Sequence, residues 1–243
     1  SHKGTQMTPT WDATDLDSGM DNGVVHEATT DTSYDNASEI RKGDATGAPL
    51  FASDLVAWYP LQETSGNTAK DFSGNGNDGT VDGAQPAGGT NLVGTNTYAF
   101  DGSNDSIILP NVLPASAFAA SAWFTTTAMD GTTGAGGNEY IIDIRGDLDV
   151  IIGWNDDFAE GRLTVWGSDT SNDTGVVVND GNLHHIAISH DGSTLKAVID
   201  GSEELSVSSS ITDTSSHPSP RIGGDSDANV YPYWQGTIAD VRL

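Results

Sequence analysis

The chain has 243 residues with 35 acidic and nine basic side chains, a formal net charge of −26 and no cysteine. Nucleic acids and anionic membranes are bound by clusters of Lys and Arg, so this composition predicts neither as a partner. The lack of cysteine excludes disulfides, thiolate metal sites and cysteine nucleophiles, and no apolar run approaches the roughly 18 residues of a membrane-spanning helix.

The acidic excess also bears on where the protein works. A net charge this large repels itself and should destabilise a compact state in dilute salt. Molar salt shortens the screening length to about 3 Å and removes most of this penalty. We therefore expect a protein from a high-salt environment, and an ordinary acidic secreted protein is the alternative.

Residues 1–50 differ in character from the rest of the chain. They are rich in Asp, Thr, Gly and Asn and show no clear periodicity, which predicts an acidic extension of irregular structure that serves as an anchor, linker or assembly arm. Short strands are expected around residues 23–28 and 39–41. The start at Ser1 has no hydrophobic signal-peptide core. If Ser1 follows a removed initiator Met, we expect synthesis in the cytoplasm and release by another route, such as inside a virus particle.

From residue 51 the chain reads as a series of β-strands. Asp-Gly pairs at Asp82, Asp101, Asp180, Asp191 and Asp200 predict tight hairpins, because Gly accepts a positive φ and Asp tolerates one. Strands at this spacing predict an antiparallel sandwich or barrel with very little helix. Short apolar runs bounded by turn residues place the strands at 55–61, 98–100, 106–109, 119–125, 140–145, 150–154, 162–167, 176–178, 183–190, 194–199, 205–207, 221–222 and 236–242.

The clearest pattern is in residues 182–208, which predict three strands joined by two tight turns. Leu195, Ala197 and Ile199 should share one face of the middle strand. His184 and His190 should share a face of the first strand, but six residues of strand span about 20 Å, too far for one metal ion. We therefore expect these histidines to be structural.

Residues 71–83 form the densest run of turn residues. Asp71, Ser73, Asn75 and Asn77 alternate along it and offer the hard oxygen atoms that Ca²⁺ prefers. The spacing is that of an EF-hand loop, but the flanking helices are missing. Two interpretations stay open at this point: a calcium-binding loop, or Asn and Gly residues present only for their turn conformations.

Five segments carry a shared pattern of strands and turns: residues 55–84, 98–110, 121–126, 180–201 and 236–243. Together they resemble laminin-G-like, concanavalin A-like jelly-roll domains of the lectin/glucanase superfamily. Leu183 departs from the pattern, because the family commonly has Trp there. The resemblance covers about residues 53–243, and it implies an all-β, two-sheet antiparallel jelly-roll sandwich over residues 51–243.

Family membership would also imply function. Such domains are mostly non-catalytic carbohydrate-binding or adhesion modules, often with one structural Ca²⁺. In the family the ion lies between the loop at 71–83 and the closing strand. The resemblance therefore implies Asp71, Asn75, Asn77 and Asp240 as metal ligands.

Sugar-binding sites combine aromatic platforms with amide and carboxylate groups. Two segments have this composition, although Trp154 could instead be core and Trp234 matches a packed position of the family. The predicted ligand-binding residues are Trp154, Asp156, Asp157, Asn229, Tyr231 and Tyr233.

Catalysis is not expected from this sequence. Glycoside hydrolysis needs two carboxyl groups on either side of the cleaved bond. Glu139 and Asp143 are four residues apart, about 13 Å along a strand, which is the wrong spacing. Asp147 and Asp149 share a face, but so acidic a chain contains such pairs by chance.

Together these observations predict a non-enzymatic recognition or adhesion module. We expect a virion surface protein (tail fibre, turret or spike) of a virus of a halophilic archaeon, which binds a glycan or glycoprotein on the host surface. Residues 1–50 would contact other virion or surface proteins, and a homo-oligomer is compatible with the sequence. The alternatives are a secreted or cell-surface carbohydrate-binding protein of a halophile, a structural virion decoration without a ligand, and a glycoside hydrolase.

Overall fold

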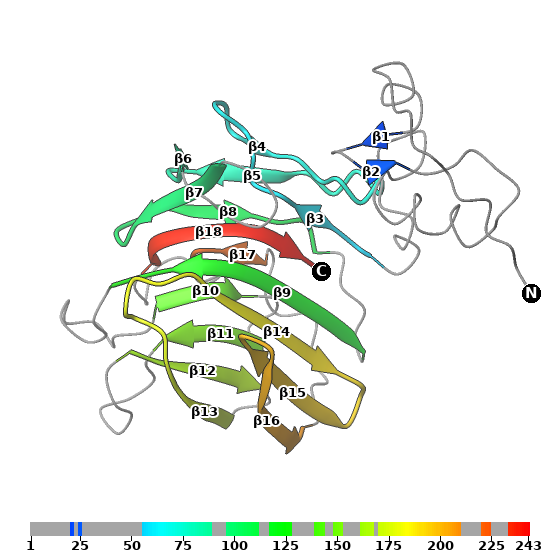
Figure 1. Ribbon diagram of the computed structural model, residues 1–243, viewed down its shortest axis with the longest axis vertical. Coiled ribbons are helices and arrows are strands. Elements are labelled where there is room, and N and C mark those ends of the chain that lie inside the picture. The colour runs from blue at the N-terminus through cyan, green and yellow to red at the C-terminus, as the bar shows by residue number, and fades with distance from the viewer. Residues whose placement is uncertain are drawn as a thin grey trace, which may run out of the picture. The chain divides into compact units, whose positions relative to one another are not determined.

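The computed structural model describes the chain as strands and connecting segments, all paired strands being antiparallel (Figure 1). None of the described residues forms a helix, and so none provides a helix of the length and hydrophobicity of a membrane span. The described residues are 20–21, 24–25, 55–88, 96–111, 117–127, 139–143, 148–152, 161–167, 170–209, 220–224 and 233–243.

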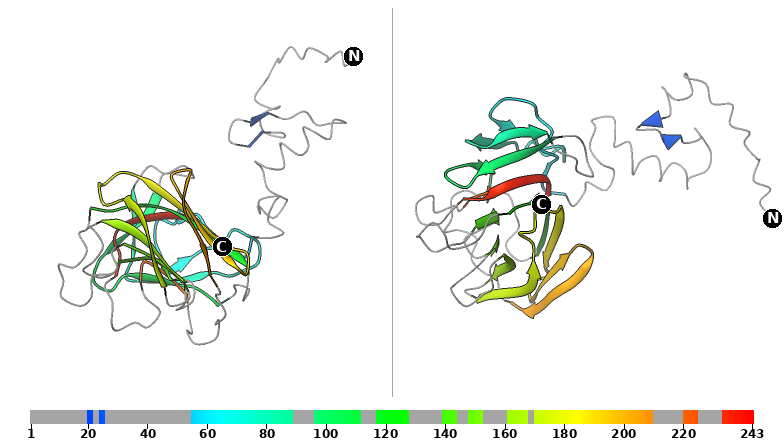
Figure 2. Two further views of the ribbon diagram at one scale, coloured as in Figure 1. Left: turned by 90° about the horizontal axis from the view of Figure 1, so that it is seen from below. Right: turned by 60° about the vertical axis from the view of Figure 1, so that its left-hand side comes forward.

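The chain divides into two compact units, Ser1–Asp54 and Leu55–Leu243. In the first unit, β1 (Met20–Asp21) pairs with β2 (Val24–Val25). The strand expected around residues 39–41 lies outside the described residues. The second unit is a sandwich of two antiparallel sheets, which confirms the predicted fold class (Figures 1 and 2).

One layer, here called the β10 sheet, contains eight strands. Their order across the sheet is β13 (Thr170–Val177), β12 (Arg162–Gly167), β11 (Leu148–Ile152), β10 (Glu139–Asp143), β17 (Arg221–Ile222), β8 (Ser106–Ile108), β5 (Gly79–Asp82) and β4 (Thr68–Ala69).

The other layer is the β14 sheet. It contains seven strands in one continuous order, and an eighth, β3 (Trp58–Tyr59), pairs with β18 outside that order. In Figure 1, β9 and β18 of this sheet lie over β10 and β17 of the other. The main order is β16 (Ser202–Ser208), β15 (Thr194–Ile199), β14 (His184–His190), β9 (Phe118–Thr125), β18 (Gln235–Arg242), β7 (Asn96–Asp101) and β6 (Gln85–Gly88).

The hydrophobic core lies between the sheets, because alternate residues of each strand point toward the facing layer. On β15, Leu195, Ala197 and Ile199 are buried while Lys196 is exposed, as the sequence predicts. The largest fully buried side chains are Trp234, Tyr59, Tyr98, Phe124, Leu61, Ile107, Ile141 and Ile142.

The Asp-Gly pairs have two different roles. Asp191 and Asp200 begin the turns of the β14–β15 and β15–β16 hairpins, as predicted. The hairpins predicted at Asp82, Asp101 and Asp180 are wrong, because the chain there passes from one sheet to the other. The physical reason is that Gly83, Gly102 and Gly181 adopt a positive φ. Glycine permits this conformation equally in a hairpin turn and in a connection between two layers, so the Asp-Gly pair does not distinguish them.

Candidate functional site

The side of the β10 sheet that faces away from the core carries a row of polar side chains. Ile107, Ile142 and Ile222 lie side by side in the core, so Ser106, Asp143 and Arg221, which adjoin them on the same strands, point to the opposite side. Leu163 and Val165 are likewise core residues on either side of Thr164. We call this surface the polar face; its residues are Ser106, Tyr140, Asp143, Arg162, Thr164, Asp173 and Arg221.

Four residues of the polar face are buried although they point away from the core. Ser106 and Thr164 are fully buried, Asp143 is 1% exposed and Tyr140 is 3% exposed. Buried polar groups normally have hydrogen-bond partners, and those without one require water or a ligand. Three buried atoms of this face have no hydrogen-bond partner among the described residues: Thr164 Oγ1, Arg162 Nε and Arg221 Nε.

Charged groups of both signs lie on the polar face. Arg162 Nη1 donates to Asp173 Oδ2 over 2.8 Å, which joins β12 to β13. Asp143 lies opposite Arg221 on one side and opposite Asp149 on the other in the strand register. Arg221 Nη1 donates to Ser106 Oγ over 2.9 Å, a contact between residues 115 positions apart in the sequence.

Tyr233 is the only predicted ligand-binding residue within the described residues, and it lies beside the polar face. A Cβ atom built on Gly224 would meet Tyr233 Cδ1 at 2.8 Å and Ser106 Cβ at 3.2 Å. Tyr233 is half-buried. The other five predicted residues, Trp154, Asp156, Asp157, Asn229 and Tyr231, lie outside the described residues. The alternative for Trp234 is confirmed, since its side chain is fully buried in the core.

The loop at residues 71–78 is organised around the Asp71 carboxylate. Asp71 Oδ1 accepts from the backbone N–H groups of Trp58 and Ser73, and Oδ2 accepts from Ser73 Oγ and the N–H of Asn77. These bonds, which outweigh the opposing effect of burial, lower the pKa of Asp71. The side-chain amides of Asn75 and Asn77 both donate to the carbonyl of Val56. The loop therefore fastens the segment that contains β3.

Asp240, the fourth predicted metal ligand, has its own partners. Its Oδ1 accepts from Trp58 Nε1 at 2.6 Å, and the Arg242 guanidinium donates to both of its oxygen atoms. Arg242 also lies 5.4 Å from the centre of the Trp58 ring. Asp240 is 4% exposed and adopts a φ of 47° at a bulge of β18.

In this arrangement the two carboxylates among the predicted calcium ligands, Asp71 and Asp240, accept hydrogen bonds from protein donors. Trp58 donates to Asp71 through its backbone and to Asp240 through its indole, and these carboxylates face N–H and O–H donors. The described residues contain no group of three or more His, Cys, Asp or Glu side chains that could hold a metal. An ion bound to both Asp71 and Asp240 would have to displace these donors, so calcium binding stays a prediction.

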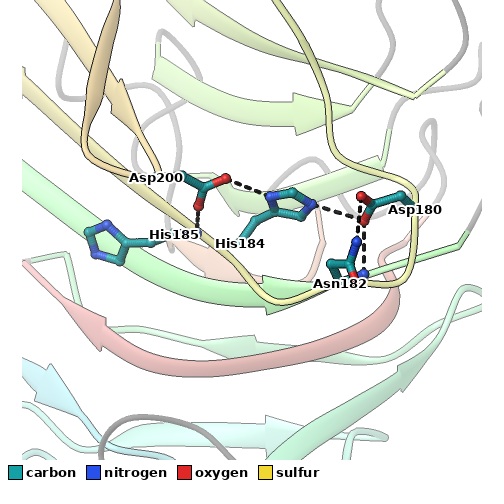
Figure 3. A network of polar contacts seen from close by, with 5 residues as sticks. All are labelled: Asp180, Asn182, His184, His185 and Asp200. Carbon is teal, nitrogen blue, oxygen red and sulfur yellow. Dashed lines mark hydrogen bonds and ion pairs between the residues drawn. The ribbon is translucent and has the colours of Figure 1, made fainter.

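A second polar cluster surrounds His184 at the start of β14 (Figure 3). Its Nδ1 lies 2.7 Å from Asp200 Oδ2 and its Nε2 lies 3.0 Å from Asp180 Oδ1. Burial lowers the pKa of His184, but the bonds to Asp200 and Asp180 outweigh it, so the pKa is raised above its usual 6.5. Hydrogen bonds from Asn182 and His184 lower the pKa of Asp180 to about 2. A doubly protonated imidazole can donate to both carboxylates, whereas a neutral one can donate to only one.

This geometry predicts a pH-dependent stability. Since the folded-state pKa of His184 is raised, its stabilisation is complete below about pH 6.5 and is lost as the pH rises through the raised value. We expect the free energy of unfolding, measured by thermal unfolding in molar salt, to fall by about 1 kcal/mol as the pH rises through the raised pKa of His184. His184→Gln should remove this pH dependence. His185→Gln is the matched control, because burial lowers the pKa of His185, so it is neutral over this range. An unchanged pH profile in His184→Gln would contradict the assignment.

A comparison with protein families identifies the superfamily to which this sandwich belongs. A family model described as the concanavalin A-like lectin/glucanases superfamily matches residues 101–243, more than half of the chain. The chain belongs to this superfamily. The matched range includes every residue of the polar face and Tyr233, and it begins after the loop at 71–78. No curated protein matches the chain in sequence.

Solved structures of low sequence identity share the fold of this lectin/glucanase-type domain. Domain 4 of AbnA, an extracellular arabinanase from Geobacillus stearothermophilus solved with arabinotriose, is 20% identical with a TM-score of 0.59, over 78% of this chain and 91% of that one. The binding domain of Paraclostridial Mosquitocidal Protein 1 is 18% identical, with a TM-score of 0.54. A Trypanosoma rangeli sialidase mutant with trans-sialidase activity is 16% identical, with a TM-score of 0.55.

The last two comparisons concern longer proteins. The matches cover 79% and 81% of the present chain but 48% and 31% of those two chains. This lectin/glucanase-type sandwich thus corresponds in fold to one part of each larger protein.

Proposed function

We propose that residues 55–243 are a non-catalytic carbohydrate-recognition module whose ligand binds at the polar face of the β10 sheet. The observation that carries this proposal is the set of buried polar atoms on that face, Thr164 Oγ1, Arg162 Nε and Arg221 Nε, that have no partner among the described residues. Membership of a lectin and glucanase superfamily supports carbohydrate as the ligand class.

The chemistry of the polar face suits sugar hydroxyl groups. A hydroxyl both donates and accepts hydrogen bonds, and the face offers guanidinium donors at Arg162 and Arg221, a carboxylate acceptor at Asp173, and the Thr164 hydroxyl. Tyr233 adds a half-buried aromatic ring beside Ser106. A few polar groups beside an aromatic surface are the usual composition of a small-molecule binding site.

Glycoside hydrolysis is the second candidate function. It is favoured by the register of β10 and β11, which places Asp149 directly opposite Asp143. Residues directly opposite each other on antiparallel strands are close neighbours, and a retaining glycosidase needs two carboxyl groups about 5–5.5 Å apart. We favour binding without catalysis, because Asp143 also lies opposite Arg221 and is 1% exposed.

The proposed setting is a surface in high salt. The net charge of −26 supports a saline environment. We propose a virion surface protein of a haloarchaeal virus that attaches to host glycans, in which residues 1–50 contact other surface proteins. A secreted or cell-surface protein of a halophile and a structural decoration are the alternatives. The test is labelling with an antibody against residues 55–243. Labelling of purified virions would support a virion surface protein, and labelling of cells alone would support a cell-surface protein of a halophile.

Binding is tested with a glycan array in 2 M NaCl followed by calorimetry on the strongest ligand. We expect Thr164→Val and Tyr233→Ala each to weaken binding about tenfold, the equivalent of about 1.4 kcal/mol. Lys196→Gln is the control, because Lys196 is an exposed residue of the β14 sheet. Failure to bind any sugar or host-envelope preparation would contradict the proposal. If the protein released reducing sugar and Asp143→Asn abolished that release, the result would establish hydrolysis instead.

A further inference from the structure

Arg221 differs from the other basic side chains of the described residues. Lys70, Arg162, Lys196 and Arg242 each form an ion pair with an Asp or Glu. Arg221 is half-buried and forms no ion pair with a described residue, although the chain carries 35 acidic groups. A partly buried cation without an anion is costly, because it loses hydration without a compensating charge.

The contacts of Arg221 leave one edge of its guanidinium without a hydrogen-bond acceptor among the described residues. Nη1 donates to Ser106 Oγ over 2.9 Å, and Ser106 is itself fully buried. Nε is buried and has no hydrogen-bond partner, and no described residue accepts from Nη2. The N–H groups on Nε and Nη2 of an arginine are parallel and match the two oxygen atoms of a carboxylate.

We propose that Arg221 binds the carboxylate of an acidic sugar, so that the ligand of the polar face is a glycan containing uronic acid. This inference rests on the proposed function and narrows its ligand class. Ser106 acts as a positioning residue, since its hydroxyl holds the opposite side of the guanidinium. Tyr233, beside Ser106, is placed to contact the ring of the same sugar.

The net negative charge of the protein is compatible with binding of an acidic glycan in molar salt. A net charge of −26 repels an acidic glycan at long range in dilute solution. In molar salt the screening length falls to about 3 Å, so the repulsion disappears while a direct contact with Arg221 persists. A carboxylate would also supply an ion-pair partner for Arg221, which forms no ion pair with a described residue although Asp143 lies opposite it in the strand register.

The test is calorimetry in 2 M NaCl with three ligands that share one backbone: oligogalacturonate, its methyl ester and the corresponding neutral galacto-oligosaccharide. We expect oligogalacturonate to bind at least about tenfold more tightly than the other two, a difference of about 1.4 kcal/mol. Arg221→Gln should abolish this preference. Arg221→Lys should also lose most of it, because an ammonium cannot present two parallel N–H groups. Arg242→Gln, which alters a paired arginine of the other sheet, should keep the preference.

The outcomes separate the inference from the proposed function. Equal affinity for the acid, the ester and the neutral sugar would overturn the role of Arg221 while leaving carbohydrate binding intact. If none of these ligands binds and the glycan array is also blank, both the role of Arg221 and the proposed carbohydrate binding are contradicted. The comparison of acid with ester uses the unaltered protein, so it decides the question even if Arg221→Gln fails to fold. A preference that survives in a folded Arg221→Gln variant would assign the carboxylate to another residue.

Discussion

Replacing Asp71 with Ala is expected to destabilise residues 55–243 by roughly 3 kcal/mol. The Asp71 carboxylate accepts four hydrogen bonds, and two of them come from Trp58 and Asn77, which lie 13 and six residues away. Hydrogen bonds to charged groups contribute about 1.5–3 kcal/mol each, and partial solvent contact reduces their sum. Urea unfolding followed by Trp fluorescence in 2 M NaCl measures the loss, since Trp58 reports directly on this loop.

Two further measurements identify the origin of that loss. Asp191→Ala is the matched control, because Asp191 accepts three similar bonds within an exposed hairpin turn but holds no distant strand; we expect a much smaller effect. The loss of stability in Asp71→Ala should be equal in EGTA and in Ca²⁺, because the groups that bond to the Asp71 carboxylate are N–H and O–H donors of the protein. A loss seen only with Ca²⁺ would show instead that Asp71 acts through a bound ion.

The loop at 71–78 shows what residue spacing can and cannot determine. Alternating oxygen-bearing side chains suit both a cation and a set of turns. In the structure the amides of Asn75 and Asn77 point their N–H donors at the carbonyl of Val56, 19 and 21 residues away. Such distant partners are set by the tertiary fold, so spacing alone could not choose between the alternatives.

Strands were predictable where burial on one side imposes a clear alternation. Residues 182–208 follow this pattern, and the three predicted strands are β14, β15 and β16. The sequence interpretation missed β4, β5 and β6 because these strands are short and contain few apolar residues. Pro86 lies in β6, an outermost strand of the β14 sheet, where proline is tolerated because one side of the strand needs no N–H donor.

The polar face was less predictable than the fold, because distant segments build it. β17 consists of only Arg221 and Ile222, and its pairing with β8 is what brings Arg221 to Ser106. A local signal did exist at Thr164, a polar residue between the buried Leu163 and Val165. It indicated only that Thr164 faces away from the core, and threonine is common in any strand.

Lowering the NaCl concentration from 2 M to 0.1 M is expected to reduce the melting temperature by about 10 °C or more, which corresponds to about 3–4 kcal/mol for a domain of this size. The screening length grows from about 2–3 Å to about 10 Å over this range, so surface carboxylates begin to repel one another. The basic residues offer little relief, because Lys70, Arg162, Lys196 and Arg242 are already paired with single acidic groups. Calorimetric melting curves at several NaCl concentrations measure the effect.

A charge variant distinguishes screening from general salt effects on hydrophobic burial. Asp82 and Glu204 are exposed, and replacing both with Lys raises the net charge from −26 to −22. If repulsion is the cause, this double variant should melt higher than the parent in 0.1 M NaCl and nearly the same in 2 M NaCl. If salt acts instead by strengthening hydrophobic burial, parent and variant should show the same slope, and the acidic composition would then say nothing about a saline habitat. The same experiment therefore tests the environment in which we propose that this module recognises its glycan.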